Sequence, residues 1–125
     1  MIIDVVRVSE KAKHQLLTLK RRTGILQWNV LCRWALLMSL AERTIPPHEE
    51  IITDSNVEMS WKTFAGALDD PITAVLLQRA HEDNVPDEQL QQFFKIHLHR
   101  GIAYLLNSAP DLRGLLATAS GLNVA

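Results

Sequence analysis

The sequence predicts a mainly α-helical fold that begins with one short strand. Residues 2–8 are rich in β-branched side chains and too few for a stable helix, so we predict a strand there. From Glu10 to about residue 106, apolar residues recur at helical spacing. The chain has 125 residues, 47% of them hydrophobic and 22% charged, which is typical of one globular domain.

The first helix is predicted over residues 10–22. Ser9 precedes it as a suitable N-cap residue, and Gly24 follows it as a C-terminal stop. Basic side chains cover most of its remaining surface. Its buried stripe is formed by apolar residues at positions i, i+4 and i+7, namely Ala12, Leu16 and Leu19.

The second helix, predicted over residues 26–42, is apolar on nearly its whole circumference. Such a helix must be buried on all sides. A monomer of this length offers little room for that, so we expect a stable homo-oligomer. The residues predicted at the subunit interface are Leu31, Trp34, Leu36 and Met38.

The rest of the chain is predicted to form shorter helical units. Residues 54–56 offer N-caps for a short helix that ends near Gly66, and Asp70 caps the next helix with Pro71 at its first position. A long helix follows Pro86. We expect one domain over residues 1–125, composed of a strand-helix-helix unit, an acidic connector, a helical remainder and a loose tail, over residues 1–43, 44–53, 54–107 and 108–125.

Charge is distributed unevenly along the chain. Residues 1–43 carry eight Lys or Arg against three Asp or Glu, whereas residues 44–92 carry two against ten. A nearly neutral chain with a basic N-terminal third is typical of a protein that presents one face to a polyanion. A segregated but merely solvated surface is the alternative. If DNA is bound, the phosphates are the expected target, through Arg7, Lys11, Lys13, Lys20, Arg21 and Arg22.

The sequence offers no constellation for catalysis. It lacks the common nucleotide-binding, zinc-protease and serine-hydrolase motifs. His97 and His99 lie two apart on a helix and project about 200° from one another, so they are expected to pack or hydrogen-bond rather than share a metal. Residues 81–83 are expected to form a solvated charged turn. We therefore predict no enzyme activity, no catalytic residue, no metal and no cofactor.

Cys32 is the single cysteine of the chain. It excludes a disulfide within the chain, and it lies in the most apolar helix, where a thiol is usually inert. This usage favours a protein of the reducing cytoplasm. The tryptophans Trp28, Trp34 and Trp61 are expected to be core or interface anchors.

The order of strand, basic helix and buried helix is similar to that of ribbon-helix-helix proteins, in which two chains pair their short strands. Many of these proteins place the strand ribbon in the DNA major groove. Base reading requires donors and acceptors directed at base edges, and this strand offers Arg7 alone for that purpose, while Asp4 repels phosphate. The sequence therefore favours phosphate contacts over sequence reading. The amides at the start of the second helix, around Gln27 and Trp28, are expected to help.

Four blocks of the sequence resemble the DndE family of the DNA phosphorothioate (sulfur) modification system. They are residues 19–23 (LKRRT), 27–35 (QWNVLCRWA), 54–61 (DSNVEMSW) and 97–105 (HLHRGIAYL). The blocks follow one another in order and span most of the chain. The tail beyond about Asn107 lies outside the resemblance.

The resemblance implies a non-catalytic subunit with a helical, ribbon-helix-helix-like core. It also implies assembly into a homotetramer, binding of nicked double-stranded DNA through basic residues, and partnership with the other components of the same modification system. The family's basic residues correspond to Lys20, Arg21 and Arg22, whereas Lys11 and Lys13 follow from the charge pattern. Two alternatives stay open: a scaffold subunit that does not bind DNA, and a ribbon-helix-helix transcriptional regulator.

Overall fold

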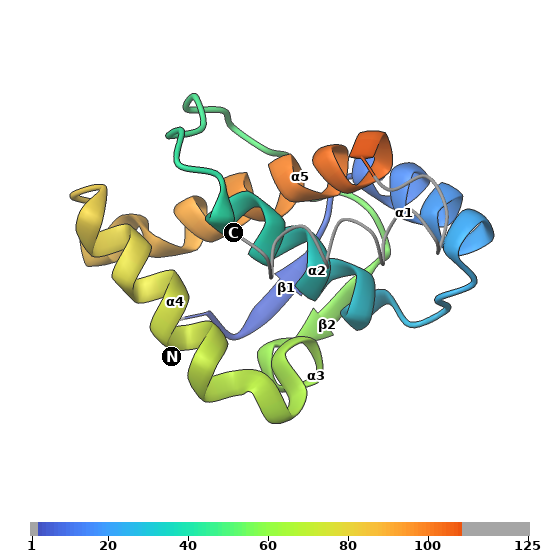
Figure 1. Ribbon diagram of the computed structural model, residues 1–125, viewed down its shortest axis with the longest axis horizontal. Helices are drawn as coiled ribbons and strands as arrows, with labels where there is room; N and C mark the ends of the chain where they lie inside the picture. The colour runs from blue at the N-terminus through green and yellow to red at the C-terminus, as the bar shows by residue number, and fades with distance from the viewer. Residues whose placement is uncertain (1–2, 109–125) are drawn as a thin grey trace.

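The computed structural model describes residues 3–108 and confirms a mainly helical fold with a short N-terminal strand (Figure 1). The predicted loose tail lies outside the described residues, except for its first position, which ends the last helix. Two short 3-10 turns join the helices, at Gly66–Leu68 and Asp87–Gln89. The strands and α-helices are β1 (Val5–Arg7), α1 (Glu10–Thr23), α2 (Trp28–Ala41), β2 (Glu58–Ser60), α3 (Trp61–Ala65), α4 (Asp69–Glu82) and α5 (Leu90–Ser108).

Helix α1 begins and ends as predicted. The Ser9 side chain accepts a hydrogen bond from the backbone N–H of Ala12 at 3.1 Å, which satisfies one of the free amides of the first turn. Gly24 adopts the left-handed conformation with φ of 76°, and its N–H donates to the carbonyl of Lys20. The caps therefore fix the length of the helix that carries the basic side chains.

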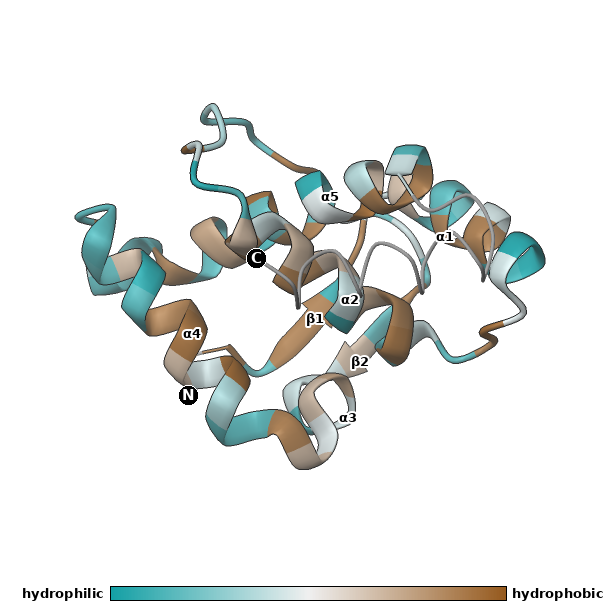
Figure 2. Ribbon diagram, in the orientation of Figure 1, coloured by the Kyte–Doolittle hydropathy of each residue, from teal (hydrophilic) through white to brown (hydrophobic). Residues whose placement is uncertain are grey.

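Helices α2 and α5 form the centre of the core (Figure 1). They cross so closely at Gly101 that a Cβ atom built there would lie 1.7 Å from the carbonyl oxygen of Ala35. Glycine at this position therefore lets the two backbones touch. Hydrophobic residues of both helices belong to the buried core, and Figure 2 shows hydrophobic stretches along both ribbons.

The burial of α2 differs from the prediction. Leu31 and Leu36 are both 0% exposed within a single chain, so no partner subunit is needed to bury them. The prediction failed because α5 and its neighbours cover more of α2 than a short chain was expected to manage. Trp34 and Met38 are partly buried against the same core. The prediction that Leu31 and Leu36 lie at a subunit interface was therefore wrong, because α5 buries them within the chain.

Strand β1 pairs antiparallel with β2, and its central residue Val6 lies opposite Met59. The segment before β2 is fixed to β1 by Ser55, whose side chain donates to the carbonyl of Val8 at 2.6 Å. In the ribbon-helix-helix arrangement this strand would pair with its copy in a second chain. Here its partner is a strand from the same chain, which the sequence analysis had assigned to a helix.

Of the two helices after β2, α3 begins later than predicted and α4 begins earlier. Helix α3 is capped by Ser60, which accepts from the N–H of Thr63, and not by residues 54–56. Helix α4 follows a 3-10 turn directly, so Asp70 lies inside its first turn and is not an N-cap. Its neighbour Asp69 instead accepts a hydrogen bond from the Trp61 indole at 2.8 Å, joining the two helices. Within residues 3–108, no helix has the length and apolar character needed to span a membrane.

Candidate nucleic-acid interface

The structure separates the five basic side chains of α1 into distinct directions. Lys13 and Lys20 are seven residues apart, and Lys11 and Arg22 are eleven apart, so each pair lies within about 20° on the helix. The two pairs flank the buried stripe on opposite sides, and Arg21 points away from the core. A single patch of all five cations, as the charge pattern alone suggested, is therefore not formed.

Lys13 and Lys20 line a groove between α1, the start of α2 and β2. Its volume is about 580 Å³. The Lys20 ammonium lies 3.5 Å from the centroid of the Trp28 ring, within the range of a cation–π contact. Partial burial lowers the pKa of Lys20. The other lining residues are three with side-chain amides, four uncharged residues and one acid that pairs with Arg7, namely Gln27, Asn29, Asn56, Leu26, Val57, Met59, Thr63 and Glu58.

The N-terminus of α2 opens into this groove. Its N-cap residue, Gln27, makes no side-chain cap hydrogen bond, and the amides of the first turn have no partner within the helix. The helix dipole adds partial positive charge at this point. The Asn29 side chain donates to the carbonyl of Thr63 and so fixes the start of α2 against α3. Two ammonium groups and a helix N-terminus thus converge here, an arrangement that suits a phosphate.

Lys11 lies on the other side of α1, in acidic surroundings. The groove it lines also contains Glu49, Glu50 and Asp54. The Asp54 carboxylate accepts a hydrogen bond from the backbone N–H of Glu10 at 3.0 Å, so this acidic segment is attached to the start of α1. Such a surface repels phosphates, so the surroundings of Lys11 do not favour the predicted contact.

Arg7 is engaged within the chain. Its guanidinium lies 3.2 Å from the Glu58 carboxylate, its direct cross-strand neighbour, and both side chains are about half exposed. The ion pair neutralises the one side chain of β1 that was expected to contact DNA. By contrast, Lys11, Lys13, Lys20, Arg21 and Arg22 form no ion pair with any acid among residues 3–108.

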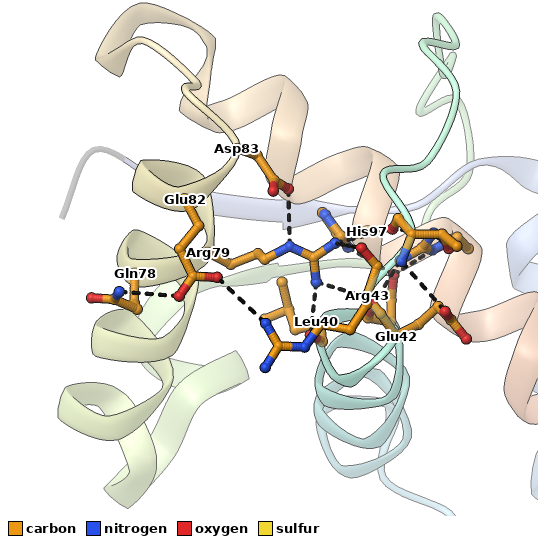
Figure 3. A network of polar contacts seen from close by, with 11 residues as sticks. Leu40, Glu42, Arg43, Gln78, Arg79, Glu82, Asp83 and His97 are labelled. Atoms are coloured by element: carbon orange, nitrogen blue, oxygen red, sulfur yellow. Dashed lines mark hydrogen bonds and ion pairs between the residues drawn. The ribbon is translucent and has the colours of Figure 1, made fainter.

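Two arginines that the sequence analysis did not single out close the C-terminal end of α2. Arg79 is 6% exposed, and its guanidinium pairs with Asp83 at 2.9 Å (Figure 3). It also donates to four backbone carbonyls, those of Leu40, Glu42, Arg43 and Thr44. The spacing of Arg79 and Asp83 at i and i+4 was the available signal, but the segment 81–83 had been taken for a solvated turn.

Arg100 completes this cluster from α5. It donates to the carbonyl and the hydroxyl of Ser39, both at 2.8 Å, and to the carbonyl of Thr44. These bonds satisfy carbonyls that a helix C-terminus leaves without intrahelical partners. Figure 3 shows the Arg79 side chain reaching from α4 to the end of α2, so three helices meet in one hydrogen-bonded cluster.

Both histidines of α5 hydrogen-bond inside the chain, as the sequence predicted. His97 Nδ1 lies 2.8 Å from the Ser39 hydroxyl. Burial, with further contributions from Arg100 and Arg79, lowers the pKa of His97 to about 4, so its ring is neutral near pH 7. His99 donates from Nδ1 to the carbonyl of Lys95 and accepts at Nε2 from the Ser9 N–H.

The single cysteine and a large aromatic residue both lie in the core. Cys32 is fully buried, and burial raises the pKa of its thiol to about 12. Residues 3–108 contain no group of three His, Cys, Asp or Glu side chains placed to hold a metal ion. The large aromatic residue Trp61 packs in the core against Phe64 and Phe94 at ring distances of 5.2 and 5.6 Å, as expected of an anchor.

The fold and this surface define a small, mainly helical protein with a basic groove beside its first helix. Residues 5–111 match the family model of the DNA sulphur modification protein DndE, and the chain belongs to that family. This confirms the resemblance found in the four sequence blocks. The family places the chain in the DNA phosphorothioation system.

Solved DndE structures share the fold. The crystal structure of DndE from Escherichia coli, involved in DNA phosphorothioation modification, is 23% identical and gives a TM-score of 0.69, covering 84% of this chain and 98% of that one. A DndE mutant crystal structure gives a TM-score of 0.66 at 20% identity, covering 85% of this chain and 99% of that one. The comparison with curated proteins gave no match.

Proposed function

We propose that this chain is a non-catalytic DNA-binding subunit of the DNA sulfur modification machinery and acts in the cytoplasm. The observation that supports this best is the set of α1 cations that no acid within residues 3–108 neutralises. Their N–H donors remain available for phosphate oxygens. Arg79 and Arg100, in contrast, already donate to carbonyls and carboxylates of the chain itself.

The groove between α1 and α2 is the proposed phosphate site. Lys13 and Lys20 lie on the same side of α1, about two turns apart, along a path that a sugar-phosphate backbone could follow toward the α2 N-terminus. Arg21 and Arg22 are exposed at the end of α1 and project in other directions, so they are proposed to contact phosphates outside this groove. Contacts of this kind carry little sequence information, so binding should depend on charge and on DNA shape.

We propose further that nicked duplex is preferred to intact duplex. A rigid surface of basic side chains contacts more phosphates when the duplex bends toward it. Bending an intact site of 20–30 base pairs by 40–90° costs on the order of 1–6 kcal/mol. A nick acts as a hinge and removes part of this cost, so affinity rises without a contact to the nick itself.

No chemical step is assigned to the chain in this proposal. The Cys32 thiol is buried and its pKa is raised, and both ring nitrogens of His99 are used in hydrogen bonds. These groups support the structure rather than a reaction on DNA. The sulfur chemistry is left to the other components of the system, which are the proposed partners.

Assembly into a homotetramer is also proposed. With Leu31 and Leu36 inside the chain, the interface moves to the opposite side of α2. There Val30, Trp34, Leu37 and Ala41 follow helical spacing and remain partly or largely exposed. Leu37 is 39% exposed. Leu37→Asp should split the oligomer in light scattering, and Leu77→Asp, at a similarly exposed position of α4, is the matched control.

A gel-shift series over salt tests DNA binding, with intact and nicked 30-base-pair duplexes as probes. Replacing Lys20, Arg21 and Arg22 with Ala should flatten the slope of log K against log salt by about 3, equally for unrelated sequences. The matched control replaces three cations outside α1, namely Arg43, Lys62 and Lys95. Equal losses in both variants would contradict the assignment to α1. If the chain shifts neither duplex at moderate salt, the scaffold alternative holds, and its acidic middle segment would then contact a basic partner.

A further inference from the structure

A second pocket shares no lining residue with the basic groove. It is formed by α5, the turn that precedes it and the segment after α2, and its volume is about 620 Å³. This volume is within the range of ligand sites. The pocket has apolar walls, contributed by Ile45, Pro46, Val85, Phe93 and Ile96.

The wall of this pocket includes a buried ring nitrogen without a hydrogen-bond partner. His97 is 0% exposed, and its Nε2 atom has no hydrogen-bond partner among residues 3–108. The Ser39 hydroxyl contacts His97 Nδ1 and also accepts from Arg100 Nε, so Nδ1 already has a partner. Nε2 is an N–H donor in one tautomer of the neutral ring and a lone-pair acceptor in the other. A buried ring nitrogen left unpaired is costly in either form, and a backbone amide group delivered from the pocket would remove that cost.

The rim of the pocket is acidic. Residues 82–88 contain four Asp or Glu and no Lys or Arg. Asp83 and Glu88 line the pocket. Asp83 is already paired with Arg79, whereas Glu88 forms no ion pair with another residue of the described part of the chain. A cation on a ligand could therefore pair with Glu88, while DNA phosphates would be repelled.

We propose that this pocket docks a basic, hydrophobic segment of a protein partner. An apolar side chain of the segment fills the space between Val85, Phe93 and Ile96. A backbone amide group of the segment pairs with His97 Nε2, through its carbonyl or its N–H according to the ring tautomer, and a flanking Lys or Arg pairs with Glu88. An apolar anchor in a pocket with charges at its rim is the usual arrangement of such sites. The inference does not depend on DNA binding by α1.

The test uses synthetic pentapeptides and the full ¹⁵N-labelled chain in NMR titrations. One series has Lys-Lys-X-Lys-Lys and the other Glu-Glu-X-Glu-Glu, with X being Leu, Ile, Met, Phe or Trp, and both ends of each peptide blocked. At least one basic peptide should shift the His97 Nε2 resonance and the amides of residues 85–97. The acidic series should leave them unchanged. The inference is overturned if no basic peptide moves the His97 resonance or if both series bind alike.

Two variants locate the peptide in the pocket. Gln92 lines it and Gln91, its exposed neighbour, does not, so Gln92→Trp should weaken binding at least tenfold and Gln91→Trp should not. Equal effects of the two would overturn the assignment. Glu88→Lys, at an exposed position, should weaken binding of the basic peptide at least threefold. This variant tests the assignment to the pocket if Gln92→Trp fails to fold. Gel shifts of nicked duplex should be the same for Gln92→Trp and the native chain, which separates this inference from the proposed function.

Discussion

The cations of α1 and the two arginines at the end of α2 carry the same charge in opposite environments. Arg21 and Arg22 are exposed and have no acidic partner within residues 3–108. Arg79 and Arg100 use their guanidinium groups on carbonyls and on Asp83 or Ser39. Counting charges along a sequence therefore does not identify a binding surface. What matters is whether the N–H donors are already occupied.

The same comparison separates effects on stability from effects on binding. A buried guanidinium that joins three segments contributes to folding, because its loss leaves carbonyls and a carboxylate without partners. An exposed cation contributes little to folding but retains its full value for an external phosphate. Substitutions in the two sets should therefore change different measurements.

The largest effect is expected for Arg79→Met. This substitution leaves Asp83, whose side chain is 12% exposed, as an unpaired and nearly buried charge. It should lower the free energy of unfolding by about 3–5 kcal/mol in urea titrations. Arg43→Met is the control, because the Arg43 side chain is 90% exposed and should change stability by less than about 0.5 kcal/mol. If both variants were equally stable, the cluster would have no structural role.

Acid should weaken the same cluster. His97 and His99 are held neutral in the folded chain, and the pKa of His97 is lowered from 6.5 to about 4. Because the unfolded chain binds these protons first, their contribution is complete above pH 6.5 and is lost as the pH falls toward 4. Between pH 7.5 and 4.5, unfolding in urea should become easier by about 2–3 kcal/mol from His97 alone.

Two features make this pH dependence specific. The window lies above the range in which Asp69, whose pKa is lowered by hydrogen bonds from Trp61 and Thr73, takes up its proton. An exposed histidine, His14, provides the control, since His14→Gln should leave the loss of stability unchanged. Equal unfolding free energies at pH 7.5 and 4.5 would show that the buried histidines are not neutral in the fold.

The difference between the two sets explains what the sequence could predict. Local signals were sufficient for α1, because Ser9, Gly24 and the apolar stripe act within one helix. The partners of Arg79 lie 35 to 39 residues away in the chain, at the end of α2, and no local pattern reports contacts at that range. The assignment of Leu31 and Leu36 to a subunit interface failed for a related reason, since α5 approaches α2 through Gly101, a residue whose role depends on a distant helix.

Within α1, the two sides of the helix should differ in DNA binding. Lys20→Ala removes a cation from the basic groove and should flatten the salt slope by about 1, which is about eightfold in affinity at 0.1 M salt. Lys11→Ala should have a smaller effect, because Glu49, Glu50 and Asp54 lie in the groove that Lys11 lines. Lys20→Arg, which keeps the positive charge, should bind DNA like the native chain. A larger loss for Lys11→Ala would place the DNA on the opposite side of α1.

The smallest effect concerns Arg7, the predicted contact that the chain itself neutralises. Its ion pair with Glu58 is about half exposed, so breaking it should change stability by less than about 1 kcal/mol. Arg7→Ala should therefore change DNA affinity by less than about twofold, whereas Glu58→Gln frees the guanidinium and should tighten binding by about two- to threefold. In the double variant no guanidinium is left to be freed, so its affinity should exceed that of Arg7→Ala only by the gain from removing an acid. This double-mutant cycle, measured by fluorescence anisotropy with nicked duplex, isolates the coupling between Arg7 and Glu58. If Arg7→Ala alone weakened binding as much as Lys20→Ala, the ion pair with Glu58 would not keep Arg7 from contacting DNA.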